Sequence, residues 1–228
     1  MDNAAKTAFL CQIPLLQPLS TLQIAQLAAS AEYRRASRWE FVYRPGDDAD
    51  KIYFLYSGRI KIGSYASDEE QREVIKDLLR TEAVFGESIL IGERTRTEFA
   101  QVLSKTAEYL AVPNSNFMAM LAGSQRMMQC CLLHMSRRLQ RIEDRLAQVL
   151  VKDARKRIIE FLLDVARKEG LPIGYETVVR DFLPHHEIAN LTGTCRQTVT
   201  AVMSELKKSN LIHFDRRSIL FRDVSKLA

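Results

Sequence analysis

The residues with the clearest chemical potential are an arginine and a glutamine at neighbouring positions, Arg196 and Gln197. In the major groove of DNA, a guanidinium can donate to the two acceptors of guanine, and an amide can match the acceptor and donor of adenine. Each such pair contributes about 1–3 kcal/mol of discrimination between bases. These two side chains therefore favour reading of a DNA sequence, provided that an exposed helix presents them.

The surrounding stretch, HHEIANLTGTCRQTVTAVMSELKKSN, predicts that helix. Gly193 separates two apolar-periodic segments, at about 185–191 and 195–208, and glycine takes the left-handed turn conformation easily. This is the pattern of a helix-turn-helix, whose second helix enters the major groove with its N-terminus first. Base contacts are then expected from the exposed positions of its first turns: Arg196, Gln197, Thr200 and Ala201.

Other polar side chains around this motif are suited to phosphate contacts. The stretch LIHFDRRSILFR follows and predicts two short strands around a polar tip, which is a wing. A helical hairpin with a solvated polar face is the alternative interpretation, but the net charge is −2 over residues 1–123, +3 over 124–151 and +4 over 152–228. The basic C-terminal half favours a polyanionic partner. The expected phosphate contacts are His186, Thr198, Lys207, Lys208, Arg216 and Arg217.

A heptad pattern runs through the middle of the chain. Seven apolar residues recur at alternating steps of four and three, as in the a/d seam of a coiled coil. An amphipathic helix that packs only on its own domain is the alternative, but the polar stretch SRRLQRIEDR is unsuited to a wide buried face. The pattern favours a parallel homodimer through this helix. The seam residues are Met128, Leu132, Met135, Leu139, Ile142, Leu146 and Val149.

The N-terminal half predicts a small β-barrel or sandwich. Between about residues 34 and 112, short strand-like segments alternate with Pro-Gly, Ser-Gly and acidic turns. A helical lead-in precedes them around STLQIAQLAASA. We therefore expect a barrel domain over residues 1–123, a dimerisation helix over 124–151 and a winged helix-turn-helix domain over 152–228.

Helix caps predict several boundaries. Ser20 is a candidate N-cap of the lead-in helix, and Asp153 is one for a helix that ends at the glycine of ARKEG. For the second helix of the helix-turn-helix, two caps remain open. Thr194 could form a capping box with Gln197, or Cys195 could hold the cap position.

Four motifs, in this order, resemble those of the cyclic-AMP receptor protein (CRP/FNR) family of bacterial transcription regulators, from about residue 10 to the C-terminus. They are RPGDDADKIYFLYSGRIKI in the early barrel strands, FGESILIGERTRT as a phosphate-binding cassette, MSRRLQRIEDRL in the dimer helix and EIANLTGTCRQTV in the helix-turn-helix. The resemblance implies an α+β fold with an N-terminal double-stranded β-helix (jelly-roll) effector domain, a long dimerisation helix and a C-terminal winged helix-turn-helix. It also implies a cytoplasmic, homodimeric regulator that binds pseudo-palindromic double-stranded DNA and contacts RNA polymerase.

The cassette has chemistry suited to a small effector. Gly86 allows close approach of the backbone, Glu87 can accept from ribose hydroxyls, and Arg96 with Thr97 can hold a cyclic phosphate. Family members that bind cyclic AMP use these positions in this way. An internal ion pair between Glu87 and Arg96 is the alternative. We count Arg138 among the expected effector contacts.

Departures from the family pattern decide what the effector and operator are expected to be. Cyclic-AMP binders place Thr-Ser on the dimer helix, where this chain has Ile142 and Glu143. Glu98, near Arg96, could neutralise the arginine or repel a phosphate. We therefore expect a cyclic nucleotide or other small effector at these positions, with cyclic AMP itself disfavoured. In the helix-turn-helix of the cyclic-AMP receptor, the resemblance implies Arg-Glu and a second arginine four residues after the glutamate. This chain has Gln197 in place of that glutamate and Ala201 in place of the second arginine, so its DNA half-site should differ.

Composition argues against other classes of protein. No apolar run approaches the roughly 20 residues that span a bilayer, which argues against a membrane protein. The four cysteines give neither a CxxC pair nor a disulfide framework, so no metal or iron–sulfur site is expected. Residues 1–123 contain no histidine, which disfavours a cupin-type metalloenzyme, and we expect no catalytic residues. A cyclic-nucleotide-binding module that acts on a protein partner is the remaining alternative, and the helix-turn-helix argues against it.

Overall fold

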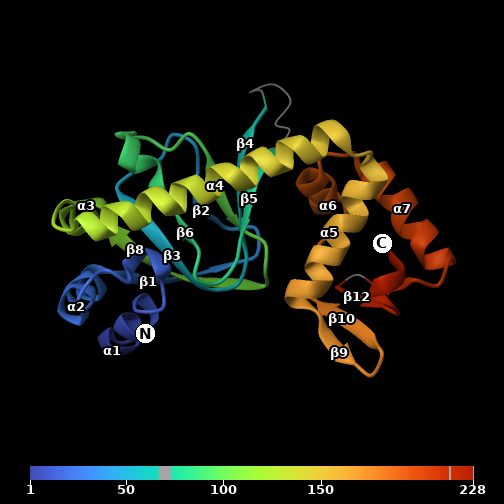
Figure 1. Cartoon of the computed structure of the whole chain (residues 1–228), viewed down its shortest axis with the longest axis horizontal. Coiled ribbons are helices and arrows are strands. Elements are labelled where there is room, and N and C mark those ends of the chain that lie inside the picture. The colour runs from blue at the N-terminus through green and yellow to red at the C-terminus, as the bar shows by residue number, and fades with distance from the viewer. Residues whose placement is uncertain (67–72, 216, 228) are drawn as a thin grey trace. The chain divides into compact units, whose positions relative to one another are not determined.

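The computed structural model describes residues 1–66, 73–215 and 217–227 (Figure 1). Close packing divides the chain into two compact units, residues 1–141 and 142–228, which we describe separately. The domain boundaries expected after residues 123 and 151 fall at the two ends of the long helix α4 (Gln125–Val151). The boundary between the two compact units, in contrast, falls within that helix, after residue 141. Within the described ranges, no helix is both long and apolar enough to cross a membrane.

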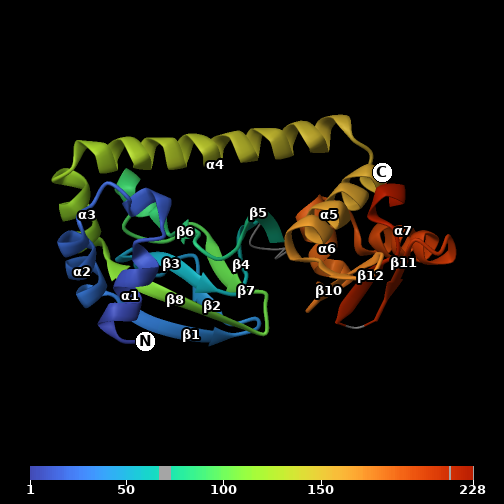
Figure 2. The same ribbon diagram turned by 60° about the horizontal axis from the view of Figure 1, so that its bottom comes forward.

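The first unit contains two four-stranded antiparallel sheets, with strand orders β1-β8-β3-β6 and β2-β7-β4-β5. This confirms the jelly-roll that the family resemblance implied (Figure 2). Strand β1 begins at Glu32, close to the predicted start of the strands near residue 34. The strands are β1 (Glu32–Ser37), β2 (Phe41–Tyr43), β3 (Lys51–Ser57), β4 (Ile60–Tyr65), β5 (Glu73–Leu79), β6 (Val84–Phe85), β7 (Phe99–Val102) and β8 (Thr106–Pro113).

Helices cover one side of this barrel. The predicted N-cap Ser20 is confirmed, because its hydroxyl accepts a hydrogen bond from the backbone N–H of Gln23, whose side chain accepts in return from the backbone N–H of Ser20. One apolar core joins these helices to β3 and β8, and Met127 and Cys131 of α4 are buried in it. The elements are α1 (Asn3–Leu10), η1 (Pro14–Leu16), α2 (Thr21–Ser30), η2 (Glu87–Ile91) and α3 (Asn114–Ala122).

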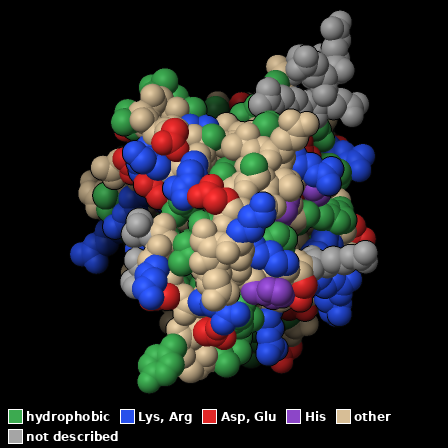
Figure 3. Space-filling view, turned by 90° about the vertical axis from the view of Figure 1, so that its right-hand side faces the viewer, with side chains coloured by type: hydrophobic (Ala, Val, Ile, Leu, Met, Phe, Trp, Pro, Cys, Tyr) green, Lys and Arg blue, Asp and Glu red, His purple; other side chains and the backbone are tan. Residues whose placement is uncertain are grey.

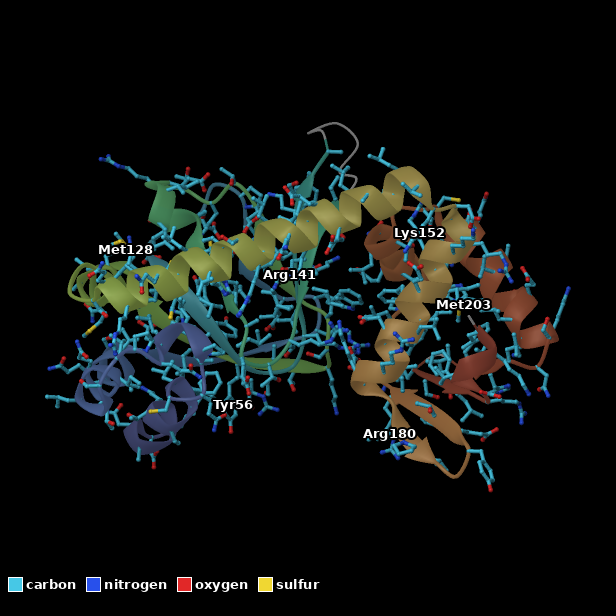
Figure 4. The ribbon with its side chains drawn as sticks, viewed as in Figure 1. Tyr56, Met128, Arg141, Lys152, Arg180 and Met203 are labelled. Atoms are coloured by element: carbon cyan, nitrogen blue, oxygen red, sulfur yellow. The ribbon has the colours of Figure 1, made fainter. Side chains whose placement is uncertain are left out.

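The other face of α4 is apolar and exposed. Met128 lies near the start of this helix, Arg141 lies along it and Lys152 lies just past its end (Figure 4). The side chains of Leu132, Leu139 and Leu146 are 64%, 57% and 59% exposed. Of the seven predicted seam residues, Met135 is half-buried and the other six are exposed. Within the part of the chain that the structure describes, this stripe stays exposed, as expected of a surface that pairs with a second helix.

The second unit contains a helical core and a four-stranded antiparallel sheet of order β11-β12-β10-β9. The predicted caps are confirmed here too: the Asp153 carboxylate accepts a hydrogen bond from the backbone N–H of Lys156 at 2.8 Å, and α5 ends at Gly170. The hairpin of β9 and β10 was not predicted. The elements are α5 (Ala154–Glu169), β9 (Leu171–Ile173), β10 (Glu176–Arg180), α6 (His185–Thr192), α7 (Arg196–Lys208), β11 (Ile212–Phe214), β12 (Ser218–Phe221) and η3 (Val224–Leu227).

Candidate nucleic-acid interface and effector cassette

Helices α6 and α7 form the predicted helix-turn-helix. Gly193 joins them in the left-handed conformation, with φ 62° and ψ 41°. The backbone N–H of Thr194 donates to the carbonyl oxygen of Ala189 at 2.9 Å, which closes the turn. Of the two candidate caps, Cys195 holds the N-cap position, without a side-chain capping bond, and α7 begins at Arg196.

One face of α7 is buried and the opposite face is open. Four apolar side chains fix the helix against its unit: Val199, Val202, Met203 and Leu206. The predicted base-contacting residues Arg196, Gln197, Thr200 and Ala201 are all exposed, and Thr198 is half-buried. Ser204 is exposed too, and it follows Gln197 and Ala201 at helical spacing on the same face of α7. The same periodicity argument could therefore have added it to the exposed positions of this face.

His185 connects α6, α7 and the wing. Its Nδ1 lies 3.0 Å from the hydroxyl oxygen of Thr200, and its ring meets that of Phe214 edge-on at a centroid distance of 5.6 Å. Burial lowers the pKa of His185, and the nearby charge of Arg196 lowers this pKa further. The Lys207 ammonium lies 5.0 Å from the centre of the Phe214 ring, so the second half of α7 is also held against the wing.

The predicted wing is confirmed as the hairpin of β11 and β12, which pair from Ile212 opposite Phe221 onward. Asp215 shapes its tip, since its carboxylate accepts from the backbone N–H groups of Arg217 at 2.8 Å and Ser218 at 2.7 Å. These hydrogen bonds lower the pKa of Asp215. The Arg217 side chain is exposed, and Arg216 lies outside the described residues.

On the face shown in Figure 3, the positive charge comes from scattered residues. Figure 3 shows Lys and Arg side chains spread over the face, with acidic side chains among them. The predicted phosphate contacts His186, Lys207 and Lys208 are exposed. The geometry therefore keeps these side chains accessible to a polyanion.

Arg157 of α5 connects the turn of the helix-turn-helix to the end of α4. Its guanidinium donates to the carbonyl oxygens of Thr192 at 2.9 Å and Gly193 at 3.1 Å. The same side chain donates to the carbonyl oxygen of Lys152 at 2.6 Å. Because helix C-termini leave carbonyl groups unpaired, one arginine here satisfies the ends of two helices.

The cassette in the first unit contains a buried arginine. Arg96 is only 2% exposed, and its guanidinium donates to the carbonyl oxygens of Gly86, at 2.8 Å, and Lys51. The guanidinium carbon lies 4.5 Å from the ring centre of Tyr43 and 5.6 Å from that of Tyr53. Carbonyl groups and aromatic rings therefore already surround Arg96, the residue that the sequence predicts to hold a cyclic phosphate.

Gly86 has a structural reason to be glycine. Its φ is 80°, and a Cβ there would lie 2.9 Å from the Tyr53 ring and 3.1 Å from Nη1 of Arg96. The close approach that glycine permits at this point is thus to the chain's own Tyr53 and Arg96.

Glu87 pairs with Arg138 of α4 and not with Arg96, which corrects the alternative ion pair. Its carboxylate binds Arg138 of α4, and it is 6% exposed. Burial raises the pKa of Glu87, although Arg138 acts in the opposite direction. Glu98 belongs to the same group of charges, since its carboxylate lies 3.2 Å from the Lys76 ammonium and 3.9 Å from the Arg138 guanidinium.

The remaining predicted effector contacts lie elsewhere. The Thr97 hydroxyl is exposed and donates to Glu93 at 3.4 Å. Ile142 and Glu143 are exposed on the part of α4 that belongs to the second unit. The structure therefore links Gly86 to Arg96 and Glu87 to Arg138, whereas Thr97 points to Glu93, and the effector roles of all seven residues stay predictions.

Three buried polar atoms of the cassette lack a hydrogen-bond partner: Oε2 of Glu87, Oγ of Ser88 and Nε of Arg96. Buried polar groups are generally hydrogen-bonded, so such a cluster is typical of a site that binds a polar ligand or water. Among the residues that the structure describes, no three His, Cys, Asp or Glu side chains are grouped so as to hold a metal ion.

Two protein-family models match the chain. The cyclic nucleotide-binding domain matches residues 33–124, and the Crp-like helix-turn-helix domain matches residues 156–228. One match lies in each unit of the structure, in the order that the motifs predicted.

Similar proteins have the same arrangement over most of their length. The CRP-like cAMP-activated global transcriptional regulator of Mycobacterium tuberculosis is 26% identical over 219 residues, which are 96% of each chain. The global nitrogen regulator of Synechococcus elongatus is 29% identical over 184 residues, 80% of this chain and 82% of that one. Among solved structures, the c-di-GMP responsive global regulator CLP of Xanthomonas campestris has the same fold, with a TM-score of 0.75, 21% identity and coverage of 89% of this chain and 99% of that one. The family models and these relatives show that the chain belongs to the CRP/FNR family of bacterial transcription regulators.

Proposed function

We propose that this protein is a homodimeric regulator that reads a pseudo-palindromic DNA site with α7. The observation that carries the proposal is the exposure of Arg196 and Gln197 in the first turn of α7, on a helix whose opposite face is fixed in an apolar core. These side chains can form bidentate hydrogen bonds with bases. The exposed Lys207, Lys208 and Arg217 are suited to phosphate contacts.

The dimer forms through the exposed seam of α4. Two parallel copies of this helix bury Leu132, Leu139 and Leu146 against one another, as knobs-into-holes packing requires. A two-fold dimer presents two copies of α7, so we expect half-site centres about one helical turn, or roughly 10 bp, apart. RNA polymerase is the protein partner that we propose for a regulator of this family.

A small polar effector binds at the cassette. The unpaired Oε2 of Glu87 and the unpaired hydroxyl of Ser88 supply an acceptor and a donor for it. Arg96 is already engaged by two carbonyl groups, so a cyclic phosphate must draw it out of its aromatic surroundings. Together with the apolar Ile142, this arrangement disfavours cyclic AMP.

Selection of bound sequences from random duplex DNA tests the proposal, with and without candidate effectors. We expect enrichment of a two-fold symmetric sequence by the wild-type protein and no enrichment by an Arg196→Ala, Gln197→Ala double variant of the same stability. Retention of DNA with no enriched sequence would contradict sequence-specific reading. If neither specific nor non-specific DNA were retained, a module that acts on a protein partner would be the better description.

A further inference from the structure

The hydroxyl group of Thr200 is already committed within the protein. Its Oγ1 donates to the carbonyl oxygen of Arg196 at 2.9 Å, one turn earlier in α7. The same oxygen lies 3.0 Å from Nδ1 of His185. A hydroxyl group has one hydrogen, and the Arg196 carbonyl takes it, so Nδ1 of His185 must donate to Oγ1. Thr200 therefore has no hydrogen left for an acceptor on a base.

His185 is held in place for this contact. It is the first residue of α6, half-buried, and its ring meets the edge of the Phe214 ring in the wing. Because its pKa is lowered, the imidazole is neutral near pH 7. Its single hydrogen is then on Nδ1, as the contact with Thr200 requires.

The chemistry that Thr200 can still offer is mainly apolar. The side chain is exposed, and with its hydroxyl turned toward the helix backbone and His185, its other branch is a methyl group. Ala201 beside it is exposed and adds a second methyl group. In the major groove, the matching apolar feature is the 5-methyl group of thymine.

We infer that Thr200 selects thymine through its methyl group, and that His185 is the positioning residue that keeps the hydroxyl of Thr200 turned away from the bases. The inference rests on the proposed function, because it assumes that α7 lies in the major groove.

Replacement of single thymines by deoxyuridine tests the thymine contact, since it removes only the 5-methyl group. Each thymine of the selected site is replaced in turn, symmetrically in both half-sites, and affinity is measured by fluorescence anisotropy. We expect one position per half-site at which the wild-type protein loses about fourfold in affinity for each methyl group, the factor that corresponds to one buried CH₂-sized group.

Two variants assign that loss to Thr200. Thr200→Ser keeps the hydroxyl and loses the methyl group, so it should bind the thymine and deoxyuridine sites equally. Thr200→Val keeps a methyl group and loses the hydroxyl, so it should still prefer thymine at that position. If Thr200→Ser kept the full preference, another residue would be reading the thymine and the inference would be overturned.

The role of His185 has a separate readout. His185→Ala removes one of the two contacts that hold the Thr200 hydroxyl and leaves only its bond to the Arg196 carbonyl, so we expect a smaller thymine preference at that position and unchanged affinity for random DNA. His185→Asn should restore the preference, because its amide nitrogen can donate from nearly the same place as Nδ1. The matched control is His186→Asn at the exposed neighbouring position, which should leave the preference unchanged.

The outcomes separate the inference from the proposed function. If an enriched site is found but no deoxyuridine replacement changes its affinity, or if its half-sites contain no thymine, the inference fails and the proposed function stands. If no sequence is enriched at all, the proposed function fails and the inference with it.

Discussion

The guanidinium carbon of Arg96 lies 4.5 Å from the ring centre of Tyr43, inside the barrel of the first unit. Arg96→Ala should therefore destabilise this unit, because it leaves the carbonyl groups of Gly86 and Lys51 unpaired and opens a cavity beside the ring. Hydrogen bonds to charged groups contribute about 1.5–3 kcal/mol each, so we expect a loss of about 3 kcal/mol or more in urea unfolding. The exposed Arg94→Ala is the control and should change stability by less than about 0.5 kcal/mol. Equal stability of the two variants would show that Arg96 is dispensable for folding.

Arg138→Ala should also lower the free energy of unfolding, because Glu87 would become a buried carboxylate without its partner. Removal of one member of a buried pair costs about 3–5 kcal/mol. Adding Glu87→Gln to this variant should recover part of the loss, since a neutral amide costs less to bury. Arg137→Ala, at the exposed neighbouring position, provides the comparison. Chemical denaturation of all four proteins checks this, and a double variant no more stable than Arg138→Ala would argue against the pair.

Leu139→Glu should abolish dimerisation, because it places a charge in the seam of α4. Gln140→Glu adds the same charge at the next exposed position, outside the seam, and should remain dimeric. Sedimentation velocity at micromolar concentration measures both, together with their affinity for the selected DNA site. A monomeric wild-type protein would contradict the proposed dimer.

Arg196→Ala and Arg217→Ala should weaken DNA binding in different ways. Loss of a base contact costs about 1–3 kcal/mol and relaxes specificity at one base pair. Loss of a phosphate contact weakens all sequences evenly and lowers the salt slope by about one. Gln197→Glu should shift the preferred base toward cytosine, because a carboxylate only accepts hydrogen bonds. Titrations of single-base variants at several salt concentrations distinguish these effects, and an even loss for Arg196→Ala would reassign it to a phosphate.

The free energy of unfolding should fall as the pH is lowered below about 6.5, the usual pKa of histidine. Burial lowers the pKa of His134 below its usual 6.5, and the charges of Arg141 and Arg138 lower this pKa further. The unfolded chain therefore binds the proton first, so stability is present above pH 6.5 and is lost as the pH falls. His134→Gln should show a shallower decline than the exposed His213→Gln control. Denaturation curves across this range check the slope, and parallel curves would exclude His134 as its source.

Periodic and local features of the fold could be predicted from the sequence. The α4 seam repeats every three or four residues, and Gly193 lies between two apolar-periodic segments, so neither needed knowledge of distant contacts. The burial of Arg96 could not be predicted in this way, because the rings around it come from two other strands, β2 and β3. The pairing of Glu87 with Arg138 likewise joins residues 51 positions apart. Strand β9 was missed because Leu171–Ile173 is short, exposed and contains a proline, which strands usually avoid.

Arg157 contacts four carbonyl oxygens, those of Val149, Lys152, Thr192 and Gly193, and these contacts have a consequence for cooperativity. Since one side chain satisfies Thr192 and Gly193 at the turn and Lys152 beyond α4, neither place can open without freeing the guanidinium from the other. Local openings of a folded protein tend to involve groups of residues that share such contacts. The last turn of α4 and the turn before α7 therefore form one unit of local stability. Whatever loosens the end of α4 then also loosens α7, the helix for which we propose the reading of DNA.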